Sequence, residues 1–170
     1  MIETYRKTHY RSPIGLIQVI GSSDGISSVS FADDAAHDDE IPTALQDCVS
    51  QLDEYFGGKR KEFSLKLDLQ GTAFQKNVWR ELQRIPFGKT VSYLDVATAV
   101  GTRDSTRAVG RANGQNPIVI IVPCHRVIGS DGSLTGYGGG LWRKRWLLDF
   151  ESSTRQDSLF AMTVESNASH

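Results

Sequence analysis

The feature that most constrains the fold is a change of periodicity near Gly71. Before it, residues 14–20 and 26–31 form short runs rich in β-branched and apolar side chains, which are typical of strands. After it, apolar residues recur at helical spacing in several short segments. The change predicts two small structural units, an α/β unit at residues 1–70 and a mostly helical unit at residues 71–151.

The remainder of the first unit is predicted to hold one helix and one further strand. Residues 42–56 carry apolar side chains at helical spacing, and Gly57 is expected to end that helix. Residues 59–69 alternate between apolar and polar, which predicts a half-buried strand leading into a connection. The acidic stretch at 33–40 is interpreted as a solvated loop. Cys48 lies on the helical segment and is interpreted as structural.

The second unit opens with two capping-box signatures. Thr72 is followed by Gln75, and Ser92 is followed by Asp95, each at the spacing in which a side chain caps a helix N-terminus. Short helices joined by a turn are typical of a helix-turn-helix, although helical hairpins that bind nothing are also common. Helices are expected at residues 72–85, 92–100 and 105–113, and a final helix at 141–150.

A run of five Ile and Val residues at 118–122 predicts a buried strand, which leads into Pro-Cys-His-Arg. A cysteine at this point is either a small buried hydrophobe or a nucleophile, because the reactive form is the thiolate and a neighbouring base or cation favours it. Adjacent side chains of an extended segment point to opposite faces, so His125 needs a local turn or a bridging water to reach Cys124. The glycine-rich loop at 136–140 lets the backbone approach a ligand closely.

Charge is distributed unevenly along the chain, although the net charge is only −1. Residues 1–70 hold 7 Lys and Arg against 12 Asp and Glu, a net −5, whereas residues 71–150 hold 11 against 5, a net +6. Residues 151–170 return to −2, with 1 against 3. A positive segment between two negative ones suits a polyanionic partner such as DNA, and it is also compatible with an incidental surface distribution.

Several function classes are not expected. No apolar stretch approaches the roughly 20 residues that span a bilayer, and the polar N-terminus carries no signal-peptide core. Two cysteines make a disulfide framework improbable and favour a reducing, cytoplasmic location. The four histidines lack metal-ligand spacing, so neither a metal nor another cofactor is expected.

Four motifs together resemble the O6-alkylguanine-DNA alkyltransferase family, also called methylated-DNA–protein-cysteine methyltransferases. They are Arg-Ala-Val-Gly at 107–110, Asn-Pro at 116–117, Ile-Val-Pro-Cys-His-Arg-Val-Ile at 121–128 and Gly-Tyr-Gly-Gly at 136–139. The resemblance is continuous from about Gly71 to Glu151 and looser before it. It implies a ribonuclease-H-like α/β N-terminal domain and a mostly α C-terminal domain, which carries the helix-turn-helix and a loop with the active-site cysteine. The polar tail at 152–170 lies outside it.

The resemblance also implies a reaction and the residues that carry it out. Cys124 would accept an alkyl group from O6 of guanine in DNA, once and irreversibly, and O4-alkylthymine is a further possible substrate. His125 would act as base through a water, with Glu151 orienting it. Asn116 would brace the turn before the cysteine, and Tyr93 would assist the departing guanine.

The implied contacts with substrate fall into two sets. The base pocket would be formed by Tyr93, the carbonyl of Val127, Tyr137, Gly138 and Gly139. Double-stranded DNA would be bound through the minor groove, by a monomer, with the damaged nucleotide rotated out of the helix. Arg107 would enter the base stack, and Arg111 would face phosphate or solvent. The full set expected to contact DNA is Arg107, Ala108, Arg111, Ala112 and Ser130.

Two other functions are compatible with parts of this pattern. A Cys-His hydrolase would also use a thiolate and an imidazole, but it would turn over repeatedly and would not need Arg107. A lesion sensor related to the alkyltransferases would bind damaged DNA without chemistry, but such relatives lack the cysteine that is present here as Cys124.

Overall fold

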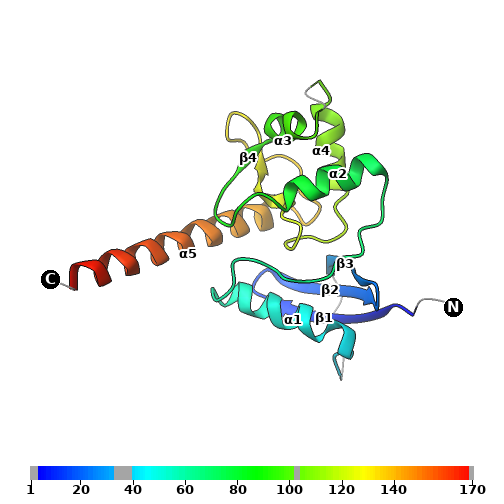
Figure 1. Cartoon of the computed structure of the whole chain (residues 1–170), viewed down its shortest axis with the longest axis horizontal. Coiled ribbons are helices and arrows are strands. Elements are labelled where there is room, and N and C mark those ends of the chain that lie inside the picture. Colours follow the sequence, from blue (N-terminus) through cyan, green and yellow to red (C-terminus); the bar gives the residue numbers. More distant parts are fainter. Residues whose placement is uncertain (1–3, 33–39, 102–103, 169–170) are drawn as a thin grey trace.

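The computed structural model describes residues 4–32, 40–101 and 104–168, with side chains up to residue 154. A small sheet with one helix forms the N-terminal part, and a mostly helical C-terminal part lies beside it (Figure 1). This arrangement agrees with the expected α/β unit followed by a mostly helical unit. None of the helices within the described ranges is long and apolar enough to cross a membrane.

The N-terminal part is an antiparallel sheet in the order β1-β2-β3, with a helix packed against β1 and β2. Strands β2 and β3 and helix α1 match the predictions, and Gly57 follows the last residue of α1 as expected. Strand β1 was not predicted, because it is largely polar and lacks a run of apolar residues. The bounds are β1 (Arg6–Ser12), β2 (Gly15–Ser22), β3 (Gly25–Ala32) and α1 (Thr43–Phe56). Most of the predicted acidic loop, residues 33–39, lies outside the described residues.

The segment 59–69 is not the strand that its alternation predicted. It meets the sheet at a single parallel bridge between Leu67 and Ile26. The N–H of Ile26 donates to the carbonyl of Lys66, and the carbonyl of Ile26 accepts from the N–H of Asp68. Phe63 and the apolar residues after it still pack against the core. The alternation therefore predicted burial on one side correctly. A strand also needs a partner strand along its whole length, and none lies beside residues 59–69 among the described residues.

The C-terminal part begins with three helices whose starts follow the sequence closely. Both predicted capping boxes, at Thr72 and Ser92, are confirmed. Helix α2 ends at Leu82, so Ile85 is buried in the turn that follows rather than on the helix. Two short strands of two residues each, β4 and β5, pair with each other in parallel. The bounds are α2 (Ala73–Leu82), β4 (Val91–Ser92), α3 (Tyr93–Ala99), α4 (Thr106–Gly114) and β5 (Val127–Ile128).

The Ile-Val run at 118–122 is also not a strand, although the expected burial is present. Ile120 has a φ of 74°, in the left-handed region that a β-branched side chain rarely adopts. The backbone there folds on itself, since Val122 N–H donates to the carbonyl of Ile118 at 3.0 Å. An apolar run predicts burial, whereas the backbone conformation depends on what surrounds it.

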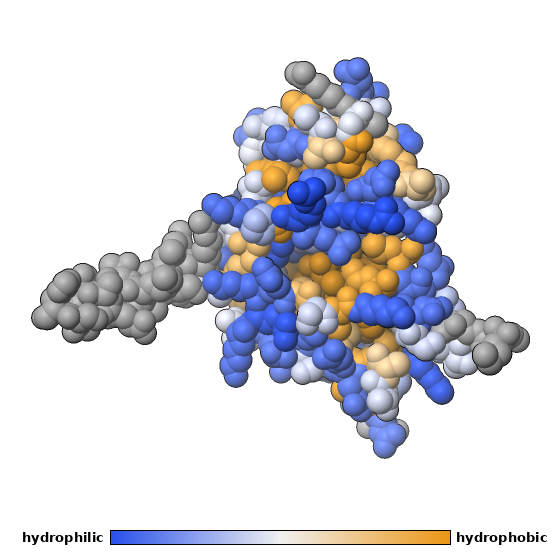
Figure 2. Space-filling view, in the orientation of Figure 1, coloured by the Kyte–Doolittle hydropathy of each residue, from blue (hydrophilic) through white to orange (hydrophobic). Residues whose placement is uncertain are grey.

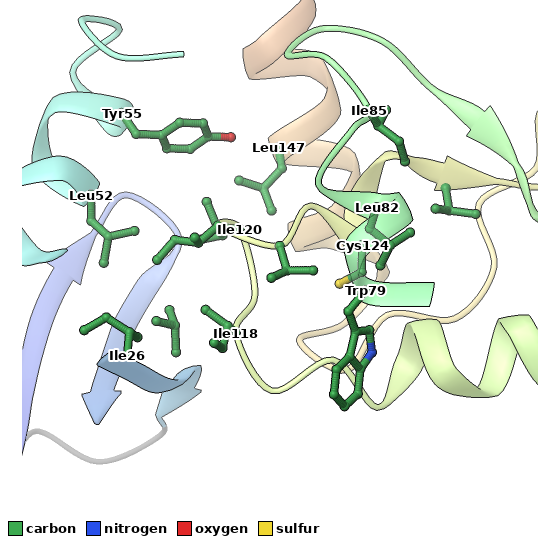
Figure 3. Packing of buried hydrophobic residues seen from close by; sticks show 14 of the residues in the cluster. Ile26, Leu52, Tyr55, Trp79, Leu82, Ile85, Ile118, Ile120, Cys124 and Leu147 are labelled. Atoms are coloured by element: carbon green, nitrogen blue, oxygen red, sulfur yellow. The ribbon is translucent and has the colours of Figure 1, made fainter. Parts of the chain in front are cut away.

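This folded segment joins the two parts of the molecule. Val29 of β3 donates to the carbonyl of Pro117 and accepts from Val119, so the segment forms a bridge to the edge of the sheet. Figure 3 shows Ile118 and Ile120 lying between side chains of the N-terminal part and those of the C-terminal part. On the face drawn in Figure 2, apolar residues likewise gather between the two parts, with hydrophilic residues around them. One continuous core therefore holds the parts together.

The last helix, α5 (Leu141–Ala168), starts where predicted but continues past Phe150. Its buried Leu147, Lys144 and Glu151 face the body of the protein. Its C-terminal end projects away from both parts (Figure 1). The tail at 152–170 is thus largely a continuation of α5 rather than a separate irregular segment.

Candidate active site

Cys124 opens a single turn of 3-10 helix, η1 (Cys124–Arg126), directly after the folded segment. Its side chain lines a cavity of about 210 Å³ while being only 4% exposed. The walls come from both parts of the molecule and from the glycine-rich loop: Ser30, Phe31, Asn113, Asn116, Val119 and residues 136–139. The thiol therefore faces a small pocket that is open on one side, and it is itself largely shielded from bulk solvent.

Opposing influences act on the Cys124 thiol. Burial raises its pKa above the usual value, and the Asn116 side chain and the positive charge of Lys144 offset only part of that rise. Asn116 also fixes the backbone that leads to the cysteine, because its Nδ2 donates to the carbonyl of Val122 at 2.7 Å and its Oδ1 accepts from Ile118 N–H at 3.0 Å. Both bonds lie within the segment that leads from Asn116 to Cys124.

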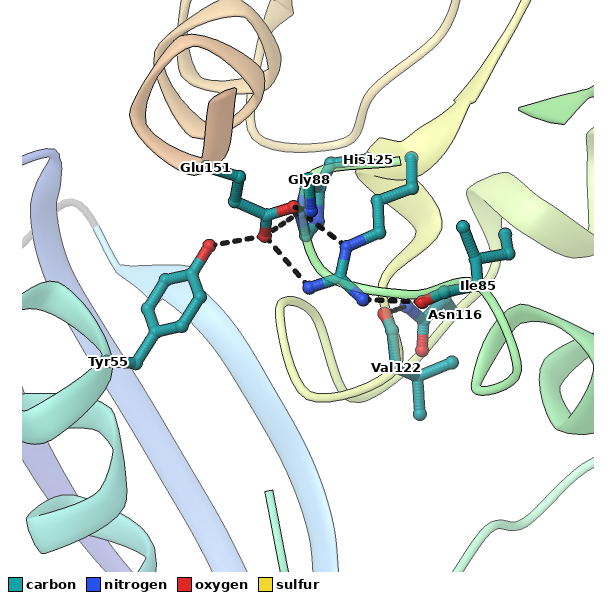
Figure 4. Close-up of polar contacts among 8 residues, drawn as sticks. Tyr55, Ile85, Gly88, Asn116, Val122, His125 and Glu151 are labelled. Atoms are coloured by element: carbon teal, nitrogen blue, oxygen red, sulfur yellow. Dashed lines mark hydrogen bonds and ion pairs between the residues drawn. The ribbon is translucent and has the colours of Figure 1, made fainter. Parts of the chain in front are cut away.

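His125 and Arg126 converge on one buried carboxylate. Glu151 Oε2 lies 2.8 Å from His125 Nε2, and Arg126 binds the same carboxylate with Nε at 2.8 Å from Oε1 and Nη2 at 2.9 Å from Oε2. Burial alone would raise the pKa of Glu151, but His125 and Arg126 together hold it well below its usual range. Figure 4 shows Glu151 at the centre of these contacts. Glu151 is thus ionised and strongly bound.

The imidazole of His125 is held neutral. Complete burial lowers its pKa, and this outweighs the opposite influence of Glu151. With Glu151 accepting from Nε2–H, the lone pair lies on Nδ1, which is buried and has no hydrogen-bond partner among the described residues. The 3-10 turn supplies the local turn that an extended segment lacks. His125 can therefore take up a proton at Nδ1.

The glycine-rich loop is clamped over the cavity. Phe31 of β3 meets the Tyr137 ring edge-on, with centroids 6.4 Å apart, and a Cβ added to Gly139 would lie 2.6 Å from the Phe31 ring. Arg143 of α5 donates to the carbonyls of Ile14 and Gly139 and stacks over Phe31 at 4.3 Å. These contacts hold the glycine-rich loop at residues 136–140, called the lid loop below, against the N-terminal sheet.

Tyr93 and Val127 do not line this cavity in the structure. The Tyr93 hydroxyl donates to the carbonyl of Thr135 at 2.8 Å, and Lys144 Nζ binds the same carbonyl at 3.0 Å. Val127 is buried in β5, where it pairs with Val91. Tyr93 is therefore connected to the pocket through the segment before Gly136.

Helices α3 and α4 form the expected helix-turn-helix, with residues 102–103 of the turn outside the described residues. Arg107 and Arg111 of α4 are exposed, Ala108 is partly exposed, and Ser130 is exposed on the loop after β5. Ala112 differs from the expectation, because its side chain is 1% exposed and its carbonyl accepts from Trp79 Nε1 at 2.8 Å. Ala112 packs α4 onto α2 and does not face the surface.

Three further residues belong to this site and were not singled out from the sequence. Phe31 closes the cavity from the N-terminal sheet, Lys144 acts on the thiol, and Tyr55 of α1 donates its hydroxyl to Glu151. In the sequence, Lys144 is simply one residue of the final helix expected at 141–150. No local pattern could have identified Tyr55, which lies 96 residues from its partner.

Among the residues the structure describes, no group of three or more His, Cys, Asp or Glu side chains is arranged to hold a metal ion. Cys48 is buried in α1, where burial and Asp47 raise its pKa to about 12.

Family models match both parts of the chain. Residues 5–69 match the ribonuclease-like domain of 6-O-methylguanine DNA methyltransferase, and residues 73–153 match its DNA binding domain. The two matches meet at the change of periodicity near Gly71.

Individual relatives cover most of the chain. A methylated-DNA–protein-cysteine methyltransferase of Mycolicibacterium paratuberculosis is 48% identical over 145 residues, which is 82% of this chain and 88% of the relative. The crystal structure of the Mycobacterium tuberculosis O6-methylguanine methyltransferase superposes with a TM-score of 0.81 at 44% identity, covering 89% of this chain and 94% of that one. The M. tuberculosis protein in complex with DNA gives a TM-score of 0.79 at 46% identity, covering 88% and 93%.

Proposed function

Since this chain belongs to the 6-O-methylguanine DNA methyltransferase family, we infer that it repairs alkylated DNA by direct reversal. It is an enzyme that transfers the alkyl group from O6-alkylguanine to one of its own cysteines, irreversibly and once per molecule. DNA is accordingly its binding partner.

The acceptor cysteine is Cys124, and one observation carries this assignment. Cys124 lines the pocket beside Asn116, within the field of Lys144, and the next residue is a neutral histidine bound to Glu151. Cys48 has the opposite surroundings, since the charge that acts on its thiol is the carboxylate of Asp47. Burial raises the pKa of both thiols, but at Cys124 the Asn116 side chain and Lys144 oppose that rise, whereas at Cys48 the carboxylate of Asp47 adds to it.

The reaction is a single displacement. His125 Nδ1 takes the proton of the Cys124 thiol through a bridging water, and the imidazolium that forms is stabilised by Glu151. The thiolate attacks the alkyl carbon, so that a sulfur–carbon bond forms as the carbon–O6 bond breaks. The electron pair of the broken bond leaves with guanine. Tyr93 turns its hydroxyl from the carbonyl of Thr135 to the departing base and supplies a proton or a hydrogen bond.

Base recognition is assigned to the lid loop and the strand beside it. Tyr137 and the glycines at 138 and 139 enclose the extruded base, and the carbonyl of Val127 accepts from its amino group once the base has entered. The buried position of Cys124 supports extrusion, because a thiol below the protein surface cannot reach a base that stays inside a duplex.

DNA binding is assigned to the exposed side of the helix-turn-helix, in the minor groove. Arg107 enters the stack, while Ala108, Arg111 and Ser130 contact the duplex around it. Ala112 is left out, because it is buried against α2. Binding is expected to be largely independent of sequence and to weaken with salt, since it depends on phosphate contacts.

The protein acts as a monomer in the cytoplasm, with residues 1–70 and 71–151 as its two domains.

Intact-protein mass spectrometry with peptide mapping tests the assignment. After incubation with a duplex carrying one O6-methylguanine, we expect one added methyl group on Cys124, saturating at one per protein. Cys48→Ala is the matched control and should react like the unsubstituted protein, whereas Cys124→Ala should bind the lesion without reacting. Tight lesion binding with no mass change would favour a sensor, and repeated turnover of an ester or amide would favour a hydrolase.

A further inference from the structure

The carboxylate of Glu151 is shared by the two parts of the molecule. Tyr55, on helix α1 of the N-terminal part, donates its hydroxyl to Glu151 Oε2 at 2.7 Å. The same oxygen lies 2.8 Å from His125 Nε2. Both Tyr55 and Glu151 are almost completely buried, and Figure 4 shows Tyr55 reaching Glu151 from the helix of the N-terminal part. The N-terminal part therefore touches the group that orients the histidine.

Every acceptor position of this carboxylate is occupied. A carboxylate offers about four lone-pair directions, and Glu151 accepts from five donors. They are the Tyr55 hydroxyl, His125 Nε2, Arg126 Nε, Arg126 Nη2 and the backbone N–H of Gly88. A carboxylate held from so many sides has one orientation only. Of these five donors, only Tyr55 belongs to the N-terminal part.

The ring and the hydroxyl of Tyr55 have separate environments. The ring packs among four phenylalanines, Phe56, Phe63, Phe87 and Phe150, with centroids 5.1 to 6.1 Å apart. The hydroxyl alone reaches the carboxylate. A phenylalanine at this position would keep the ring contacts and remove only the donor, so packing and hydrogen bonding can be tested apart.

We propose that Tyr55 is a positioning residue for alkyl transfer, whose hydroxyl holds Glu151 in the orientation that keeps the His125 proton on Nε2. The inference rests on the proposed role of His125 as the base. With Nε2 protonated, the lone pair is on Nδ1, where the proton of the thiol must arrive. The proton on Nε2 stays in place throughout, and the charge gained on Nδ1 is balanced by Glu151.

Charged and titratable groups surround the His125–Glu151 pair from each element packed against it. They are Tyr55 from α1, Arg126 and Cys124 from η1, Lys144 from α5 and Tyr137 from the lid loop. Arg126 and Lys144 lower the pKa of His125 and Glu151 raises it. A donor to Glu151 withdraws negative charge from the carboxylate, so Tyr55 acts in the same direction as Arg126.

Removing the hydroxyl therefore shifts the pH dependence of the reaction. Without it, Oε2 carries more negative charge, the imidazolium is favoured, and the pKa of His125 rises. A protonated His125 cannot accept the thiol proton, so the acid limb of the rate profile moves to higher pH. On that limb we expect Tyr55→Phe to react roughly tenfold more slowly, with a smaller loss on the alkaline plateau.

The experiment compares Tyr55→Phe with Tyr10→Phe in the full chain. Tyr10 is a matched control, because its hydroxyl also donates to a carboxylate of α1, Asp53, at 3.1 Å, but at the surface. Single-turnover methyl transfer from an O6-methylguanine duplex is followed at saturating DNA between pH 5.5 and 9. Melting temperatures and DNA affinities of both variants are measured alongside.

Each outcome decides between a positioning and a structural role. A displaced acid limb for Tyr55→Phe only, with unchanged DNA affinity, supports the inference. A lowered melting temperature with an unmoved profile overturns it while leaving the proposed function intact, whereas absence of methyl transfer in the unsubstituted protein overturns the proposed function itself.

A second measurement does not depend on the stability of the variant. Nitrogen-15 spectra of the unsubstituted protein should show His125 neutral at pH 7, with its proton on Nε2. A proton on Nδ1, or an imidazolium at that pH, would contradict the inference.

Discussion

Replacement of Glu151 by glutamine should destabilise the protein far more than its loss of one charge suggests. The glutamine side chain would present an amide N–H₂ towards donors that now bind a carboxylate, and Arg126, only 6% exposed, would lose its ion pair. Breaking a buried pair by removing one partner costs about 3–5 kcal/mol. For a domain of this size each kcal/mol lowers the melting temperature by roughly 2–4 °C. We expect Glu151→Gln to melt roughly 6–20 °C below the unsubstituted protein.

The binding of Glu151 should also make the stability of the protein depend on pH. The pKa of Glu151 is depressed in the folded state, so its contribution is complete above the unfolded value of about 4.3 and is lost as the pH falls towards the folded pKa. The stability difference between the unsubstituted protein and Glu151→Gln should therefore be constant around neutral pH and narrow below about pH 4.

Circular dichroism melts at several pH values measure both effects, with Glu54→Gln as the control. Glu54 pairs with Arg60 at 3.5 Å, but its side chain is 41% exposed, and such a surface pair contributes at most about 1 kcal/mol. If Glu151→Gln melted no lower than Glu54→Gln, the argument that a saturated buried carboxylate holds this region together would be refuted.

Three further predictions concern the site and its surface. Lys144→Gln removes a positive charge that acts on Cys124, so the pKa of the thiol should rise. Carboxamidomethylation of Cys124 by iodoacetamide near pH 7 should then slow by roughly threefold to tenfold, and an unchanged rate would rule out the electrostatic role of Lys144. Phe31→Ala opens the cavity from the side of the sheet. When O6-benzylguanine and O6-methylguanine duplexes compete, the ratio of benzyl to methyl transfer should rise roughly tenfold, and an unaltered ratio would show that the contact of Phe31 with the lid loop does not limit adduct size. Arg111→Ala should lower the slope of DNA affinity against log salt by about 1 without changing methyl transfer at saturating DNA, whereas an equal slope would place Arg111 away from phosphate.

Local structure in this protein was predictable because its signals act over a few residues. The capping boxes at Thr72 and Ser92 each join a side chain to a backbone group three residues away, so both can be predicted from the sequence. The four motifs between residues 107 and 139 likewise indicated the family, because each is a short contiguous run. The burial of Ile118 and of residues 120–122 followed from the composition of the run alone.

The tertiary structure decided what those residues do in space. The left-handed backbone at Ile120 arises where the segment meets Val29 and joins the two parts, which no apolar run can indicate. The clamp of Phe31 on the lid loop, the charge of Lys144 near the thiol and the Tyr55 hydroxyl on Glu151 all join residues distant in sequence. Amino-acid patterns encode which side chains are buried and which turns can form, because these depend on neighbours along the chain. Contacts between distant elements depend on how the shared core closes, so the surroundings of Cys124 could be known only from the folded molecule.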